Sequence, residues 1–454
     1  MHNMNVIVAG DSNVGYVIAE ALYKEGCNVV LIDKNEDTIA KANAELDVIC
    51  IKGKGHSAGV LLEAGIRDAD ILIAASPSDE MNMVCCLTAK KLGASYTVAR
   101  IRDPEYAHEL DMLKNELGID LIINPEREIA LEISRVVRFP SAVDIESFVG
   151  GRVEMVEFRV FENDPMVGVP LHKLAKTHSD ILFCAVERES EIIIPNGEYM
   201  MQVGDMVFIV GEPFCVMQFF KKTGKYMQKI KNSIIIGGGK VAYYLSQVMV
   251  EMGIKVKIIE ANKDRCMELN ELLPKVMVIN GDGTEQDLLD SENIEETGAF
   301  IALSNNDEDN AMASLYAMRC GVKTIITMLN RVSYIDILKS FGIYSSVCPM
   351  FTTANMITRY VRSVKNSKGS FVENLYKMLD GNVEVLEFTA TSTTHFLDIA
   401  IMELNLRKNL LIAAIARGRK IIVPRGTDKI HEGDKIVVVA PGGKIVDLND
   451  IFAH

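Results

Sequence analysis

The sequence contains 454 residues, 48% of them hydrophobic and 24% charged, which is the composition of a folded globular protein and excludes a disordered chain. Its formal net charge of −14 disfavours binding to nucleic acid or to anionic lipid. The length exceeds what one hydrophobic core can organise and predicts three or four domains.

From residue 5, short apolar strands alternate with amphipathic helices. The predicted strands cover residues 6–9, 29–32, 48–51, 71–75 and 97–101, and the predicted helices cover 14–25, 36–46 and 82–92. Apolar strands joined by helical crossovers indicate a parallel sheet covered on both faces. We therefore predict a first Rossmann-like domain over residues 1–135.

A second, strand-rich pattern begins near residue 141. Turn residues separate predicted strands at 153–160, 182–186, 192–195 and 206–210, which predicts a small α/β module over 141–225 whose end, from Lys221 to Lys225, is a linker. The plan then repeats as a Rossmann-like domain over 232–362 and a small module over 368–454. The strands predicted in that last module are 383–388, 411–416, 421–424 and 435–439.

The two halves match residue by residue as well as in plan. Gly237 follows Gly10 by 227 positions, Glu260 follows Asp33 by the same interval, and Asp79-Glu80 recurs at a spacing of 228. An internal repeat of this length indicates duplicated structural units. The predicted fold class is α/β, with two Rossmann-like parallel-sheet domains, each followed by a small α/β module, in tandem.

A dinucleotide-binding fingerprint opens the first half. A glycine-rich turn follows the first strand and opens a helix, and an acid ends the second strand; the turn and helix N-terminus receive a diphosphate, and the acid holds the ribose. Ser12 stands where the motif has glycine, so we expect weaker binding here. The candidate binding residues are Gly10, Ser12, Asn13, Val14, Gly15 and Asp33.

The second half carries the fuller fingerprint, with both leading glycines present. Lys240, at the predicted helix start, either reaches a phosphate or lies solvated. The acids oppose a 2′-phosphate, which leaves NAD(H), ATP, ADP and AMP open and disfavours NADP. The candidate residues are Gly237, Gly239, Lys240, Val241, Ala242 and Glu260.

Further polar residues lie where ligands of parallel sheets bind, at the carboxyl ends of strands. Arg100 and Arg102 either face a phosphate or form ion pairs. Residues 76–80 and 304–308 are interpreted first as helix starts with serine caps and Pro77 in the first turn, and second as ligand contacts. The sequence contains no Walker A motif, so ATP hydrolysis by a P-loop is not expected.

The cysteines, the apolar stretches and the N-terminus carry three further expectations. The nine cysteines show no Cys-x-x-Cys spacing, which predicts reduced, mostly buried thiols and neither a disulfide framework nor a metal site. The apolar run at 410–416 is far shorter than the ~20 residues that span a bilayer. The N-terminus lacks the basic and apolar regions of a signal peptide, and we expect a cytoplasmic protein.

These motifs resemble the regulator of potassium conductance (RCK) domains, and the tandem arrangement is similar to the TrkA family, the peripheral subunits of Trk-type bacterial potassium transporters. The resemblance covers essentially the whole chain and is most specific from Gly53 to Tyr106. The second copy runs on to Tyr334, with Met328 in place of Arg100. Ser12 and Lys54 depart from the family pattern, which favours Gly and Asp there.

The resemblance implies a non-enzymatic regulatory subunit. It implies NAD(H) or ATP/ADP as regulatory ligands, regulatory C-terminal modules that bind cyclic di-AMP in related proteins, and a homotetrameric ring beneath a membrane pore subunit, whose conformation ligand binding shifts. An NAD-dependent oxidoreductase is the alternative, since one fold hosts many functions. It would need a proton-transfer residue and a substrate domain, and the sequence shows neither. A cytosolic nucleotide sensor with another partner also remains open.

Overall fold

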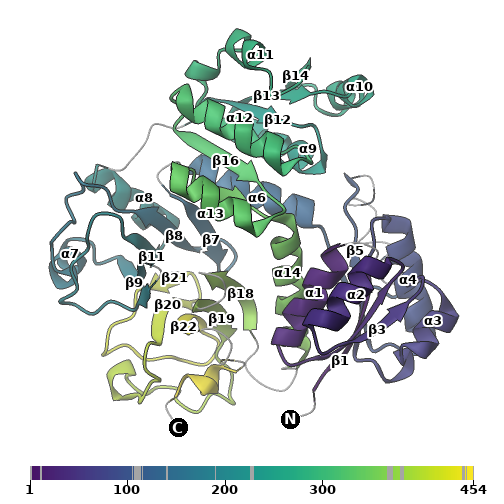
Figure 1. The fold of residues 1–454 in the computed structure, drawn as a ribbon. Helices are drawn as coiled ribbons and strands as arrows, with labels where there is room; N and C mark the ends of the chain where they lie inside the picture. The colour runs from purple at the N-terminus through teal and green to yellow at the C-terminus, as the bar shows by residue number, and fades with distance from the viewer. Residues whose placement is uncertain are drawn as a thin grey trace. The chain divides into compact units, whose positions relative to one another are not determined.

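The computed structural model describes residues 3–10, 13–104, 106, 114, 116–139, 142–189, 191–224, 230–365, 372–378, 383–441, 445 and 447–452. The chain forms two compact units, each of which takes one segment from each half of the sequence (Figure 1). Unit 1 consists of Met1–Ile133 and Lys231–Val361, and unit 2 of Ser134–Ile230 and Arg362–His454.

The first Rossmann-like domain contains a six-stranded parallel sheet of order β3-β2-β1-β4-β5-β6. Helices α1 and α2 lie on one side of it and α3 and α4 on the other (Figure 1). This is the doubly wound order predicted from the alternating pattern. The strands are β1 (Asn5–Gly10), β2 (Asn28–Asp33), β3 (Ile49–Lys52), β4 (Ile71–Ala75), β5 (Tyr96–Arg100) and β6 (Leu121–Ile123), and the helices are α1 (Asn13–Lys24), α2 (Glu36–Glu45), α3 (Ala58–Glu63), α4 (Asp79–Leu92) and α6 (Pro125–Arg138).

The second Rossmann-like domain repeats this topology as β14-β13-β12-β15-β16-β17. Its strands are β12 (Asn232–Ile236), β13 (Lys255–Glu260), β14 (Met277–Asn280), β15 (Ala299–Ala302), β16 (Thr324–Met328) and β17 (Ser345–Val347). Its helices are α9 (Lys240–Glu251), α10 (Lys263–Leu272), α11 (Gln286–Ser291), α12 (Asp307–Arg319), α13 (Val332–Phe341) and α14 (Pro349–Lys365). The predicted fold class of the two domains is confirmed.

A glycine loop after the third strand of each sheet packs against the first strand. A Cβ atom on Gly55 would lie 2.6 Å from the Cβ of Ala9, and one on Gly283 would lie 2.3 Å from the Cγ2 of Ile236. Any larger residue would push the loop off the sheet. The segment that begins at Gly53, where the family resemblance is strongest, is therefore built for close packing.

Unit 2 holds two five-stranded antiparallel sheets, of order β10-β9-β11-β8-β7 and β18-β19-β22-β20-β21. One face of each contributes to a shared apolar core that includes Phe148, Phe208, Val385 and Val437. The first module contains β7 (Asp144–Phe148), β8 (Val153–Arg159), β9 (Ile181–Arg188), β10 (Glu191–Ile193), β11 (Met206–Gly211), α7 (Leu171–Thr177) and α8 (Pro213–Lys222). The second contains β18 (Val372–Met378), β19 (Val383–Thr389), β20 (Leu411–Arg417), β21 (Lys420–Ile422) and β22 (Lys435–Pro441).

Two boundaries fall inside helices. The expected end of the first domain at residue 135 lies within α6, which continues to Arg138, and α8 continues through Lys221 and Lys222. The linker prediction was wrong for those two residues, because they complete an amphipathic helix that buries Phe219 and Phe220. Lys225 lies outside the described residues.

Six of the nine cysteines are buried, and all nine thiols are free, as predicted. Within the described ranges, no helix is long and apolar enough to cross a bilayer. The same part of the chain contains no group of three His, Cys, Asp or Glu side chains that could hold a metal ion.

Candidate functional site

In the first half, the fingerprint glycines bring helix α1 against the end of β1. A Cβ atom on Gly10 would lie 2.8 Å from the Cα of Gly15, and one on Gly15 would lie 3.0 Å from the Cα of Gly10. This is the close helix-to-strand packing that the motif requires. Asn13 and Val14 begin α1, Asn13 exposed and Val14 half-buried, and Ser12 lies outside the described residues.

The acid of the first half is buried. Asp33 ends β2 with 0% of its surface exposed, and its Oδ1 accepts a hydrogen bond from the backbone N–H of Asn35 at 2.8 Å. A ribose hydroxyl would reach this carboxylate only if neighbouring residues moved.

In the second half, the acid is half-buried and bonded to the glycine turn. The N–H of Gly238 donates to Glu260 Oε2 at 2.6 Å, and the N–H of Asn262 donates to Oε1 at 2.7 Å. Each carboxylate oxygen has two lone pairs, so each can accept one more hydrogen bond, for example from a hydroxyl group. Glu260 therefore fixes the turn and keeps lone pairs available to a further hydrogen-bond donor.

The turn itself leaves room for a phosphate. Gly237 has φ +89°, which favours glycine, while Gly239 caps helix α9 and is exposed. In the described part of the chain, no heavy atom lies within 4 Å of a Cβ built on Gly239, apart from its chain neighbours. Val241 and Ala242 are buried and hold the helix start in place. The open face of Gly239 is where the motif lets a pyrophosphate approach.

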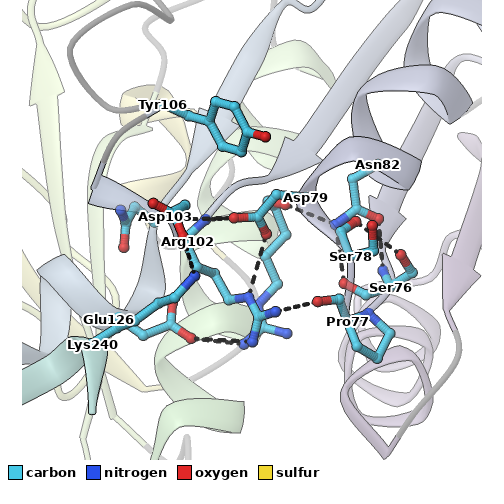
Figure 2. A network of polar contacts seen from close by, with 12 residues as sticks. Ser76, Pro77, Ser78, Asp79, Asn82, Arg102, Asp103, Tyr106, Glu126 and Lys240 are labelled. Carbon is cyan, nitrogen blue, oxygen red and sulfur yellow. Dashed lines mark hydrogen bonds and ion pairs between the residues drawn. The ribbon is translucent and has the colours of Figure 1, made fainter. Parts of the chain in front are cut away.

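Lys240 is paired with an acid in this structure. Its Nζ lies 2.9 Å from Oδ2 of Asp103, which follows β5 in the first Rossmann-like domain, so the lysine pairs with an acid of the other half. Figure 2 shows Lys240 in the polar network of that half.

Both arginines form ion pairs, Arg100 as the last residue of β5 and Arg102 just after that strand. Arg100 Nη2 lies 3.1 Å from Glu126 Oε1, and both side chains are largely buried. Arg102 Nε lies 3.4 Å from Asp79 Oδ1 (Figure 2). Burial lowers the pKa of Arg100, and the neighbouring Glu126 carboxylate opposes that shift. Glu126 was missed in the sequence; its signal was the helix-opening Asn124-Pro125 pair, with proline at the first helical position.

The segments at 76–80 and 304–308 are helix starts, with two corrections. Ser78 caps α4 by accepting the N–H of Met81 at 3.2 Å, but Pro77 precedes the cap and lies outside the first turn. In the second half the cap is Asn306 and not a serine. An amide oxygen caps as well as a hydroxyl does, so residue type alone did not locate the cap.

Each of these helices begins with an aspartate whose carboxylate binds the loop after the fifth strand. We call this contact the latch; the sequence did not reveal it. Asp79 Oδ2 accepts the N–H groups of Arg102 and Asp103 at 2.9 and 2.8 Å, and Asp307 accepts those of Asn330 and Arg331. These carboxylates fix the loop that leaves the fifth strand of each sheet. The repeat of Asp79 at Asp307 was the available signal.

Two asparagines complete the latch. Asn82 Nδ2 donates to the carbonyl oxygen of Arg100 at 2.7 Å, and Asn310 Nδ2 donates to that of Met328 at 2.9 Å. Both side chains are buried, with exposed fractions of 1% and 0%, and join the fourth strand to the fifth. These hydrogen bonds of the aspartate and the asparagine therefore recur at matching positions in the two halves.

Two domain families each match the chain twice, in alternation. The TrkA-N domain family matches residues 6–125 and 233–349, and the TrkA-C domain family matches residues 155–224 and 385–453. Among solved structures, the GsuK RCK domain aligns with a TM-score of 0.63 at 16% identity and covers 97% of this chain and 93% of that chain. The GsuK channel bound to NAD aligns equally well over 97% of this chain and 77% of its own. At this identity the likeness shows the fold.

Curated relatives match over nearly their whole length. The Trk system potassium uptake protein TrkA of Haemophilus influenzae is 32% identical over 462 residues, which cover 99% of this chain and 98% of the relative. The TrkA homolog 1 of Methanosarcina mazei is 32% identical over 457 residues, which cover 99% and 100%. With its tandem TrkA-N and TrkA-C domains and these full-length relatives, the chain belongs to the TrkA family of potassium uptake proteins.

Proposed function

We propose that this chain is a nucleotide-binding regulatory subunit of a Trk-type potassium uptake system, acting without catalysis of its own. Its ligand is NAD(H), ATP or ADP, and the second Rossmann-like domain is the principal site. The observation that carries this proposal is the pairing of Glu260 with the N–H of Gly238 beside the open face of Gly239.

The preference for the second domain rests on its acid. Glu260 is half-buried, whereas Asp33 is fully buried. A ribose reaches a partly exposed carboxylate without rearrangement of the protein, and it reaches an enclosed one only at the cost of opening the site. The GsuK channel, which shares this fold, has been solved bound to NAD and bound to ADP, which supports the choice of ligands.

The regulatory mechanism that we propose is a population shift. The nucleotide binds one arrangement of the paired Rossmann-like domains better than another, and a cytoplasmic homotetrameric ring passes this bias to a membrane-embedded pore subunit. A ligand with equal affinity for both arrangements would shift nothing. Binding of cyclic di-AMP at the modules of unit 2 is a further part of the proposal.

Calorimetric titration of the purified, nucleotide-stripped chain with NADH, NAD, ATP, ADP and cyclic di-AMP tests the ligand assignment, and light scattering in the same buffers tests the tetramer. Saturable binding of at least one nucleotide, together with co-purification of a membrane pore protein, is the expected result. Absence of binding by every ligand would remove the sensory role, and a monomer at micromolar concentration would remove the ring.

The variant E260A is expected to weaken nucleotide binding by roughly 10- to 100-fold, because hydrogen bonds to a charged group are the strong ones in such a site. Glu251, exposed at the far end of α9, supplies the matched control E251Q, which removes one negative charge from the same domain. Calorimetry measures both variants, and thermal unfolding checks that the turn has kept its structure. Equal affinity in E260A and E251Q would show that Glu260 does not hold the ligand.

A further inference from the structure

The start of helix α9 is bonded to the first Rossmann-like domain at three points. Lys240 pairs with Asp103, the hydroxyl of Tyr244 donates to the carbonyl oxygen of Arg102 at 3.1 Å, and the same hydroxyl accepts from Asn124 Nδ2 at 2.9 Å. Burial raises the pKa of Tyr244 to about 12, so its hydroxyl stays protonated as a donor. The start of α9 in the second half thus contacts the segment that follows β5 in the first half.

This contact has no counterpart at the equivalent positions of the repeat. Asp103 matches Arg331, because their N–H groups donate to the equivalent aspartates Asp79 and Asp307. By the fingerprint spacing, Lys240 matches Asn13 and Tyr244 matches Val17. Arg331 instead pairs with Glu308 at 3.0 Å. Among the described residues, α9 of the second domain contacts the loop after β5 of the first, and the matching residues of the other copies lack the side chains that form this contact.

The position of Lys240 sets up a competition. It is the first residue of α9, next to the open face of Gly239, where a diphosphate would lie, and both its side chain and that of Asp103 remain about one-third exposed. One ammonium group cannot give its strongest hydrogen bonds to a carboxylate and a phosphate in different places. A ligand phosphate that draws Nζ away from its position 2.9 Å from Asp103 Oδ2 therefore weakens the pair.

We propose that the Lys240–Asp103 pair is an autoinhibitory clasp: it holds the two Rossmann-like domains together when the second site is empty, and a ligand phosphate at that site opens it. This inference rests on the proposed nucleotide binding at the second site. The clasp lowers the affinity of that site by the free energy of the pair. By reciprocity, the ligand loosens the contact between the domains to the same extent.

The clasp reaches the first site through fixed groups. The backbone N–H of Asp103 donates to the carboxylate of Asp79, which also contacts Arg102. The guanidinium of Arg102 in turn lies 3.9 Å from Glu126 (Figure 2). Opening the clasp leaves the Asp103 carboxylate without Lys240 beside this network. Occupancy of the second site is thereby communicated to the carboxyl edge of the first sheet.

Nucleotide titration of four variants tests the clasp. In D103N, which keeps the N–H bond to Asp79, the affinity for ADP or NAD is expected to rise by ~2- to 5-fold, the worth of a partly exposed ion pair. K240M keeps the apolar stem and loses the phosphate partner, so its affinity falls. The double variant D103N/K240M is expected to match K240M, because Asp103 acts only through Lys240. E251Q controls for the loss of one negative charge.

The outcomes separate the clasp from the proposed function. A gain in D103N that vanishes in the K240M background, with E251Q unchanged, establishes the competition. If the gain in nucleotide affinity persists in the K240M background, or if E251Q reproduces it, the gain comes from the change in net charge and the clasp is overturned. Unchanged or weaker binding by D103N overturns it as well, while the nucleotide site stands. Wild-type protein that binds no nucleotide overturns the proposed function and the clasp together.

Discussion

Replacing Arg362 with Met is expected to destabilise unit 2 by about 3–5 kcal/mol, the usual cost of removing one partner from a buried ion pair. Arg362, on α14, makes a two-point contact with Glu384 on β19, with N–O distances of 2.9 and 3.1 Å. Their side chains are only 6% and 2% exposed. Without the guanidinium, the carboxylate would stay enclosed without its counter-charge.

The internal repeat supplies the matched control. Arg138, at the end of α6, pairs with Glu154 on β8 in the first module, but its side chain is 49% exposed. Glu154 is only 3% exposed, but water can take the place of the half-exposed guanidinium beside it, so R138M is expected to cost less than R362M. A chain of several domains has no single free energy of unfolding, so amide hydrogen exchange of β18–β22 in R362M and of β7–β11 in R138M is the measurement. Similar small losses of protection in both would contradict the argument from burial.

The interior of the fold could be predicted from the sequence because its signals are local. Each central strand is a short apolar run between turn residues, and β4 was predicted with its observed ends, Ile71 and Ala75. The strands β6 and β7, Leu121–Ile123 and Asp144–Phe148, were not predicted. The first has only three residues, and the second, with Asp144, Glu146 and Ser147, is not an apolar run, so their pairing with β5 and β8 defines them.

In the candidate site, too, the features set by local spacing were predicted, and the contacts between distant residues were not. The glycine turns and the two acids follow a fixed spacing, so the sequence predicted that the turn and Glu260 belong to one site, and in the structure Gly238 of that turn contacts Glu260. The partner of Lys240 lies 137 residues away in another domain, and no local pattern predicts such a pair. Nor does the motif reveal that Asp33 is enclosed while Glu260 is half-exposed, because the surrounding chain sets that difference.

The Arg100–Glu126 pair offers the second large effect. Arg100 ends β5 and Glu126 follows Pro125 at the start of α6; in the second half Met328 ends β16 and Met350 follows Pro349 at the start of α14. The repeat thus has an ion pair in one copy and two methionines at the matching positions of the other. Arg100 Nε and Glu126 Oε2 are buried without a hydrogen-bond partner among the described residues, so the ion pair is incompletely satisfied.

We expect E126M to destabilise the first Rossmann-like domain by about 3–5 kcal/mol, because it leaves the buried guanidinium of Arg100 without its carboxylate. The double variant R100M/E126M is expected to recover to within about 1 kcal/mol of the original protein or better, since well-packed apolar residues often replace a buried pair without loss. Hydrogen exchange of β5 and α6, with thermal unfolding alongside, measures both variants.

If the double variant is as unstable as E126M, methionine does not fit at these positions in the first half, and the charges are needed to hold the loop after β5. If it is stable, its nucleotide titration decides what the pair is for. Unchanged binding makes Arg100 and Glu126 a packing alternative to two methionines. Binding lost only at the first site gives Arg100 the phosphate contact that its place at the carboxyl end of β5 allows, and the buried ion pair is then the resting partner of a ligand-binding side chain.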